Sequence, residues 1–331
     1  MKILLITIIS VAALLFSACS SKEVYKPSEV AGSWKSSGSS EFTVKNISPD
    51  AALIESRKVF ADGKILDIKI QDGYKLLGYS DGWVMSSDID GNLTLQNSVD
   101  TKTVNKFNLK RTIATAAIKD DIMAVLFSNN EMALYSIANK SLLLKEQGNP
   151  PIVVNSKIVK PYFKDDLVIF STLDGKIVII NSKTKKKLRT VIVSGEEHFN
   201  NIIFLNLIDN KIVAATGHKI LSLAQKEIRL SHDIRSATTD DKNIFVATKQ
   251  GEIISLTPDL GQNAKLKFPF AHFLGMIVSG ENLYALEKEG YVIEMSKDLS
   301  KHKVYKVNVE DGFVFINDKI FFVDDEYISV E

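Results

Sequence analysis

The chain has 331 residues, of which 45% are hydrophobic and 24% are charged, and its formal net charge is +1. This composition is typical of a globular protein, with enough residues for one large domain or two ordinary ones. Because the net charge is close to zero, there is no global field to attract a polyanion, and we exclude nucleic acid as a partner.

The first predicted element is a lipoprotein signal peptide over residues 1–18. An apolar run over 3–16 follows the cation at position 2; it has the length of a signal-peptide core and is short for a membrane-spanning helix. The sequence Phe-Ser-Ala-Cys at 16–19 then resembles the lipobox of bacterial lipoproteins. The resemblance implies cleavage before Cys19 and a lipid anchor on Cys19, whose several acyl chains make membrane attachment stable. The alternative is a plain secreted protein, but Cys19 is the only cysteine and has no partner for a disulfide.

The next predicted element is a lipidated, Ser-rich tether over residues 19–40, which holds the body away from the bilayer. Trp34 is its apolar exception and predicts a short edge strand that docks on the folded body. Ser20, rather than Asp, follows the lipidated position. By the enterobacterial sorting pattern, this predicts a periplasm-facing anchor in the outer membrane, with the inner membrane as the alternative.

From residue 41 onward, short apolar runs with period-two alternation are separated by turn residues. One unit recurs: a turn, an apolar strand, a second turn with Gly or Asn, and another strand. It is clearest over 165–180, 241–256 and 281–295. A weaker copy turns near Asp50. The second turns are expected 34 to 45 residues apart, at Gly91, Asn130, Gly175, Gly217, Gly251, Gly290 and about Asp325.

Four short strands in each unit of about 40 residues are typical of a β-propeller blade. We therefore predict an all-β fold over residues 41–331, a single β-propeller of four-stranded antiparallel blades. Seven or eight blades fit, and eight is slightly favoured. The last unit ends one strand short, so we expect an N-terminal strand from around Trp34, or from 42–46, to close the ring. The rival folds are a β-solenoid, whose coils are shorter, and a two-domain β-sandwich.

The units look most like PQQ-type repeats. The sequence Asn-Ser-Lys-Thr-Lys-Lys at 181–186 matches that pattern in part, with Lys185 where Gly is usual and Arg189 where Trp is usual. A lipobox, a tether and a PQQ-like propeller together resemble the BamB family of outer-membrane lipoproteins. The resemblance implies a non-catalytic scaffold that binds a periplasmic or outer-membrane protein, with a factor of β-barrel assembly as the partner. The alternative is a ligand-binding or enzymatic propeller that uses its central channel.

The sequence predicts no catalytic residues, no metal site and no cofactor. It contains no metal-binding His or Cys motif, no nucleophile elbow and no phosphate-binding Gly-rich loop. PQQ would need a packed tryptophan and acidic metal ligands, which the repeats lack. We expect surface or turn positions for the five histidines, which are His198, His218, His232, His272 and His302.

Two further sites are hypotheses from local sequence. Asp-Gly-Asn-Leu-Thr at 90–94 fits an acidic N-glycosylation sequon, with Asn92 in an expected exposed turn. The strongest basic cluster is a candidate patch for an anion or an acidic partner, with a solvated turn as the alternative. Its residues are Lys183, Lys185, Lys186, Lys187 and Arg189.

Overall fold

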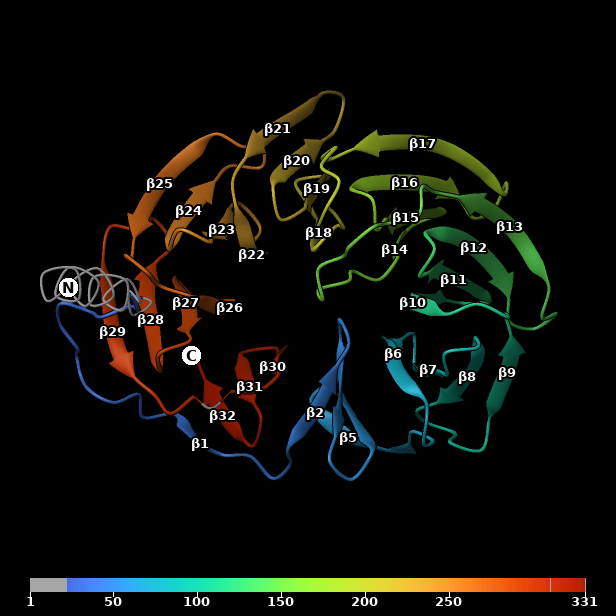
Figure 1. Cartoon of the computed structure of the whole chain (residues 1–331), viewed down its shortest axis with the longest axis horizontal. Helices are drawn as coiled ribbons and strands as arrows, with labels where there is room; N and C mark the ends of the chain where they lie inside the picture. Colours follow the sequence, from blue (N-terminus) through green and yellow to red (C-terminus); the bar gives the residue numbers. More distant parts are fainter. Residues whose placement is uncertain (1–22, 310, 331) are drawn as a thin grey trace, which may run out of the picture.

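A computed structural model describes residues 23–309 and 311–330 of the chain. These residues form eight antiparallel sheets of four strands each, arranged around a central axis (Figure 1). The predicted single β-propeller is confirmed, with eight blades rather than seven. The signal peptide and Cys19 lie outside the described residues, so the lipid anchor stays a prediction.

The blades are numbered in chain order, and within each blade the strands run from the innermost to the outermost. Blade 1 contains β2 (Val44–Ile47), β3 (Ala51–Ile54), β4 (Lys58–Ala61) and β5 (Lys64–Lys69). Blade 2 contains β6 (Lys75–Ser80), β7 (Trp83–Ser87), β8 (Asn92–Asn97) and β9 (Val104–Asn108). Blade 3 contains β10 (Ile113–Lys119), β11 (Ile122–Phe127), β12 (Glu131–Ser136) and β13 (Leu142–Gln147). Blade 4 contains β14 (Tyr162–Lys164), β15 (Leu167–Ser171), β16 (Lys176–Asn181) and β17 (Lys186–Ile192).

The second half of the ring follows the same order. Blade 5 contains β18 (Phe204–Ile208), β19 (Lys211–Ala215), β20 (Lys219–Leu223) and β21 (Glu227–Ser231). Blade 6 contains β22 (Ile234–Thr239), β23 (Ile244–Thr248), β24 (Glu252–Leu256) and β25 (Gln262–Lys267). Blade 7 contains β26 (Phe273–Ser279), β27 (Asn282–Glu287), β28 (Tyr291–Ser296) and β29 (His302–Lys306). Blade 8 contains β30 (Val314–Asn317), β31 (Ile320–Val323), β32 (Glu326–Ser329) and β1 (Ser37–Ser39).

The turns between the second and third strands explain the recurrent Gly and Asn. Positive φ angles between 66° and 86° occur at Gly91, Asn130, Gly175, Gly251 and Gly290. A Cβ atom on Gly251 would lie 2.2 Å from the carbonyl oxygen of Phe268, so this turn also requires glycine sterically.

Gly217 and Asp325 lie in their second turns as expected but without a positive φ, whereas the expected second turn at Asp50 was wrong. In the turn of blade 8, Asp324 rather than Asp325 lies in the left-handed region. Asp50 lies between β2 and β3, which is the first turn of blade 1. The second turn of that blade has Arg57 at a φ of 63°, a residue that carries no turn signal in the sequence.

Each blade buries both of its faces against its two neighbours. In β15, Val168 and Phe170 pack against blade 3, whereas the intervening Ile169 packs against blade 5. All three are at most 1% exposed. A strand that is buried on both faces has a continuous apolar sequence, which is why the middle strands are more apolar than simple alternation requires. The outermost β17 has one solvated face, and only Val191 is buried in it.

The ring is closed by the N-terminal segment, as the sequence predicted. β1 pairs antiparallel with β32, so blade 8 takes its outermost strand from the start of the described chain. Trp34 precedes β1, and its Nε1 donates a hydrogen bond to the carbonyl oxygen of Ser329 at 2.8 Å. Its ring packs edge-on against Tyr284 and Tyr305 of blade 7. Trp34 therefore ties blades 7 and 8 together at the closure.

Much of the segment expected to be a free tether also lies on the ring. Tyr25 is buried, and its ring packs edge-on against Phe268 and Tyr291. The backbone N–H of Ala31 donates to the carbonyl oxygen of Val304 at 2.8 Å, beside the edge of β29. These contacts and β1 extend the ring to residues before the expected boundary at position 41, because aromatic side chains and an open strand edge bind the segment.

Replacing Trp34 by alanine is expected to lower the free energy of unfolding by about 2 kcal/mol, because it removes buried apolar area and one hydrogen bond at the ring closure. The change is measured by urea unfolding, monitored through the backbone circular dichroism signal, which does not depend on tryptophan fluorescence. Trp34→Phe, which keeps most ring packing, is the matched control and should lose less. An unchanged unfolding midpoint for Trp34→Ala would contradict closure by this segment.

Candidate partner-binding face

One face of the propeller carries all the connections between blades. Because neighbouring strands are antiparallel, the start of the innermost strand and the turn between the second and third strands lie at the same end of each blade. We call the face formed by these connections and turns the loop face. Its two longest connections are residues 148–161, between blades 3 and 4, and residues 193–203, between blades 4 and 5.

Three exposed aromatic side chains lie on separate connections of the loop face. Phe199, Phe270 and Phe313 are between 46% and 58% exposed, and each lies in the connection that precedes the innermost strand of blade 5, 7 or 8. The φ angles of Phe199 and Phe270 are 51° and 66°. The left-handed region costs a bulky residue about 1 kcal/mol or more, so the surrounding structure must hold the backbone of these two residues in that conformation.

Phe199 belongs to a small contiguous patch. Its backbone N–H donates to the carbonyl oxygen of Val153 at 2.9 Å, which joins the two long connections. Val153 and its neighbour Ile152 are exposed as well. We call these three residues, Ile152, Val153 and Phe199, the apolar patch. Exposed apolar groups that are clustered rather than scattered are typical of protein-binding surfaces.

The connection over residues 148–161 crosses the central lumen, and we call it the plug segment. Figure 1 shows the chain before β14 extending into the middle of the ring, toward the tip of β2. Lys160 forms an ion pair with Asp50 of blade 1, and its Nζ lies 3.3 Å from the carbonyl oxygen of Tyr79 in blade 2. Lys157 reaches the other way, and its Nζ donates to the carbonyl oxygen of Arg235 in blade 6 at 3.3 Å. One segment thus touches three blades across the lumen.

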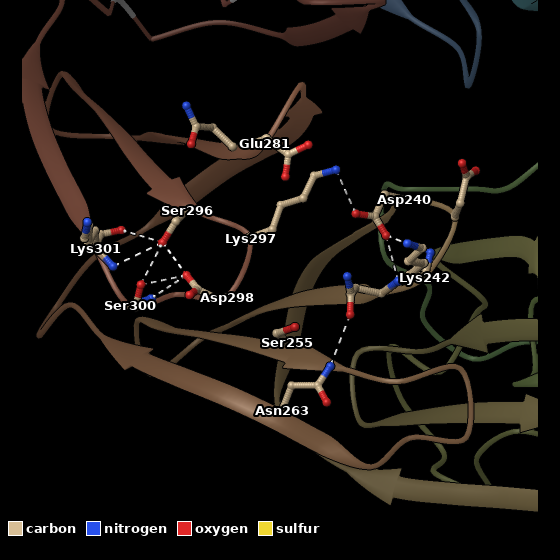
Figure 2. Close-up of a pocket in the computed structure, with 13 residues that line it drawn as sticks. Asp240, Lys242, Ser255, Asn263, Glu281, Ser296, Lys297, Asp298, Ser300 and Lys301 are labelled. Atoms are coloured by element: carbon tan, nitrogen blue, oxygen red, sulfur yellow. Dashed lines mark hydrogen bonds and ion pairs between the residues drawn. The ribbon is translucent and has the colours of Figure 1, made fainter.

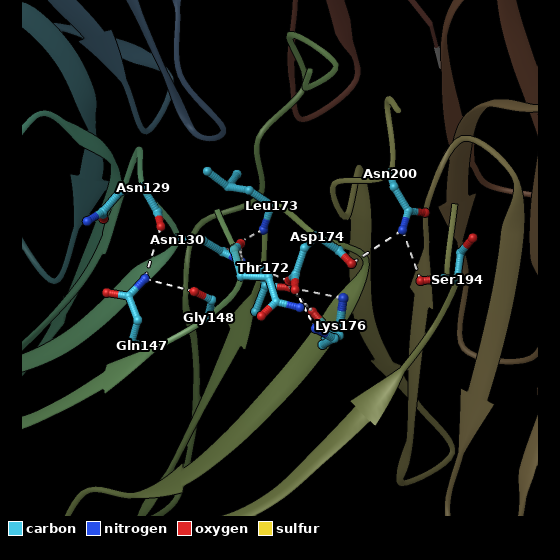
Figure 3. A network of polar contacts seen from close by, with 11 residues as sticks. Asn129, Asn130, Gln147, Gly148, Thr172, Leu173, Asp174, Lys176, Ser194 and Asn200 are labelled. Carbon is cyan, nitrogen blue, oxygen red and sulfur yellow. Dashed lines mark hydrogen bonds and ion pairs between the residues drawn. The ribbon is translucent and has the colours of Figure 1, made fainter. Parts of the chain in front are cut away.

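A buried polar network holds the root of the plug segment (Figure 3). Asn130 is fully buried. Its Nδ2 donates to the carbonyl oxygen of Asn149 and to Oδ1 of Asp174, both at 2.8 Å. Its Oδ1 accepts a hydrogen bond from the N–H of Leu173 at 2.9 Å. The side chain of one turn in blade 3 therefore fixes both the plug segment and the matching turn of blade 4.

The same network reaches the second long connection. Nδ2 of Asn200 donates to the carbonyl oxygens of Asp174 and Ser194, at 3.3 and 2.9 Å. Burial acts to raise the pKa of the Asp174 carboxyl, but hydrogen bonds from Lys176, Thr172 and Asn130 outweigh it, and the pKa is lowered. A charged Asp174 is thus the stable form at neutral pH, which retains the hydrogen bond from Asn130 at the root of the plug segment.

The predicted basic cluster lies on the rim of the ring, away from the loop face. Lys187 of β17 forms an ion pair with Glu146 of blade 3, and Arg189 pairs with Glu227 of blade 5. Lys185 lies in the turn before β17 and donates to the carbonyl oxygen of Ser182. Charged residues also protect an exposed outer strand from pairing with other chains. The role of the basic cluster as an anion or partner patch stays a prediction. It now rests mainly on Lys183 and Lys186, which are exposed.

Asn92 does not lie in an exposed turn as expected. It is the first residue of β8 and is only half-exposed. Its Nδ2 donates to Oδ2 of Asp88 at 2.6 Å, and its backbone N–H donates to Oδ1 of the same residue at 2.8 Å. Glycosylation at Asn92 stays a proposal, and the modified amide would have to give up or share the hydrogen bond to Asp88.

The histidines lie on connections and at strand ends, as expected. One of them, His272, has a contact that the sequence did not indicate. Nε2 of His272 lies 2.7 Å from a guanidinium nitrogen of Arg235, beside Lys157 at the lumen. His302 packs edge-on against the ring of Phe268. Within residues 23–309 and 311–330, no three His, Cys, Asp or Glu side chains form a group able to hold a metal ion.

A polar cavity of about 810 Å³ lies between blades 6 and 7, at the turns opposite the loop face (Figure 2). Its polar and charged groups bind one another: Lys297 pairs with Asp240 at 3.0 Å, and the hydroxyls of Ser296 and Ser300 donate to Asp298. Hydrogen bonds to the carboxylate lower the pKa of Asp298 to about 2, with the Ser296 hydroxyl contributing most. These carboxylates are stabilised in the charged form, which is the opposite of what a general acid needs.

These features define a class of protein, a closed eight-bladed β-propeller whose lumen is crossed by a segment of its own chain. BamB from Moraxella catarrhalis has a similar structure, with a TM-score of 0.68 at 12% identity over 89% of this chain and 98% of that one. The C-terminal WD40 domain of Sif2 is also similar, with a TM-score of 0.64 at 11% identity over 90% and 99% of the two chains. The predicted BamB-like propeller fold is confirmed, and at these identities the likeness concerns the fold.

Sequence relatives come from Helicobacter pylori. The plasminogen-binding protein PgbB of strain J99 is 32% identical over 207 residues, and that of strain 26695 is 33% identical over 208 residues. The matches cover 61% of this chain and 38% of the relatives, so this chain spans well under half of their length. No protein-family model matches the chain. None of the described residues forms a helix with the length and apolarity needed to cross a membrane.

Asn130→Ala is expected to lower the free energy of unfolding by about 3 kcal/mol, because it leaves several buried polar groups without partners. It should also make the plug segment cleavable by a protease under native conditions. Asn130→Gly is the matched control for backbone strain, since glycine accepts the positive φ but makes none of the side-chain bonds. Equal stability of Asn130→Ala and the wild-type protein would show that the network does not hold the plug.

Proposed function

We propose that this chain is a non-catalytic, membrane-anchored scaffold of the periplasm that binds a protein partner through its loop face. The observation that supports it most is the exposed apolar patch, where the plug segment and the second long connection meet. Rigid connections that expose aromatic side chains suit protein binding.

The similar proteins support a binding role. The curated relatives are named as plasminogen-binding proteins, and BamB has the same propeller architecture. We propose that the partner is a factor of outer-membrane β-barrel assembly. The relatives' name makes plasminogen a second candidate partner, because the matched region, at 32% identity, covers 61% of this chain. The alternative, an enzymatic or ligand-binding propeller, would use the cationic lumen near Lys157 and Arg235.

The partner can be captured by photocrosslinking from the loop face. Phe199 is replaced by benzoylphenylalanine in the lipidated protein, and native membranes are irradiated. We expect a crosslink to the core protein of the barrel-assembly machinery, because the apolar patch should be buried in the complex. Added plasminogen tests the second candidate in the same assay.

Val99 provides the matched control for this crosslink. It is 93% exposed and apolar, but it lies in the turn between β8 and β9, at the end of the blade opposite the loop face. A probe at Val99 should capture neither protein. Repeated absence of a crosslink from Phe199, or equal crosslinking from both positions, would contradict binding by the loop face.

We also propose that Cys19 carries the lipid anchor in the outer membrane. The wild-type protein is expected in the detergent phase after temperature-induced phase separation, with an intact mass above that of its polypeptide. Cys19→Ala should move to the aqueous phase and lose the added mass, whereas Ser21→Ala, outside the lipobox, should behave as wild type. Recovery of the unmodified wild-type protein in the aqueous phase would refute the anchor.

A further inference from the structure

The plug segment brings a lysine into the lumen and holds it there. The N–H of Asn155 donates to Oδ1 of Asn201 at 2.6 Å, and Nδ2 of Asn201 donates back to the carbonyl oxygen of Lys157 at 2.7 Å. The Nζ of Lys157 then donates to the carbonyl oxygen of Arg235 on β22 at 3.3 Å. A loop from one side of the ring and a strand from another thus place two cationic residues together.

Arg235 has an unused donor at this place. One of its terminal nitrogens lies 2.7 Å from Nε2 of His272. A guanidinium only donates, so Nε2 of His272 is the acceptor and carries no proton in this arrangement. The Nε of Arg235 is buried and has no hydrogen-bond partner among the described residues. A buried donor without an acceptor costs about 1–3 kcal/mol, which an incoming oxygen ligand would relieve.

The charges of Lys157 and Arg235 are also not compensated. Across the described parts of the chain, neither residue forms an ion pair with a carboxylate, whereas Lys160 on the same segment pairs with Asp50. Burial lowers the pKa of Lys157, and the like charge of Arg235 lowers it further. Burial likewise lowers the pKa of Arg235. A negative group between them would reverse both effects.

We propose that Lys157 and Arg235 form an oxyanion-binding site in the lumen, with one ligand oxygen on Arg235 Nε and another on the Lys157 ammonium. Carboxylate and phosphate oxygens match these donors, since the planar guanidinium binds two oxygens of either group with paired hydrogen bonds and lysine adds a point charge. The oxyanion is either a free small anion or an acidic side chain that enters the lumen. The site stands independently of the proposed scaffold role.

Thermal unfolding of the intact protein with inorganic phosphate, against sodium chloride of equal ionic strength, tests the site. At a phosphate concentration roughly ten times Kd, we expect Tm to rise by about 3 °C. Arg235→Gln and Lys157→Gln should lose this rise. Lys183→Gln removes an equal charge from the rim and should keep it. A hexaglutamate peptide in place of phosphate distinguishes a side-chain carboxylate from a free anion.

A rise in Tm with phosphate alone assigns a free oxyanion to the site, and a rise with hexaglutamate assigns an acidic side chain. No rise with either probe overturns the proposal, and so does an equal rise in all three variants, which would show general anion stabilisation. Crosslinking from Phe199 is measured separately on Arg235→Gln. If crosslinking from Phe199 is retained but neither anion raises the Tm of the wild-type protein, the anion site is refuted and the scaffold role is not.

Discussion

The stacking of each blade between two neighbours is the interaction on which the rest of this structure depends. A single four-stranded sheet with apolar residues on both faces cannot be stable alone in water. In blade 4, Phe170 packs toward blade 3 while Ile177 and Ile179 pack toward blade 5. Such a series of sheets ends only when the last one meets the first. Pairing of β1 with β32, together with Trp34, meets that requirement.

Closing the ring creates a second constraint at its centre. Each innermost strand pairs on one side only, so its other edge turns backbone N–H and C=O groups toward the lumen. The plug segment meets this edge from inside, with Lys160 near the carbonyl oxygen of Tyr79 and Lys157 at that of Arg235. The side chain of Asn130 fixes where the segment leaves the wall. The same segment that crosses the lumen exposes Val153 and, through the carbonyl oxygen of Val153, holds Phe199 on the loop face.

The repeat made much of the fold predictable, and the candidate site was much less so. Gly91, Gly175 and Gly290 mark tight turns because few other residues adopt their backbone angles, and this chemistry can be read locally. The longest step between turns, from Asn130 to Gly175, contains the plug segment, so its length was a usable signal. The outward position of Phe199 had no such signal, since a phenylalanine in a sequence is normally expected in a core.

The sequence by itself determined the all-β class, the unit of about 40 residues, the closure by an N-terminal strand and the lipobox-like motif at Cys19. These depend on short-range patterns, namely alternation, turn residues and the order of neighbouring residues. The tertiary structure alone decided that Tyr25 packs on the ring and that Lys187 and Arg189 pair with neighbouring blades. It also placed Lys157 beside Arg235, 78 residues away in the chain. Such pairs form because ring closure brings distant segments together, and no local pattern encodes that distance.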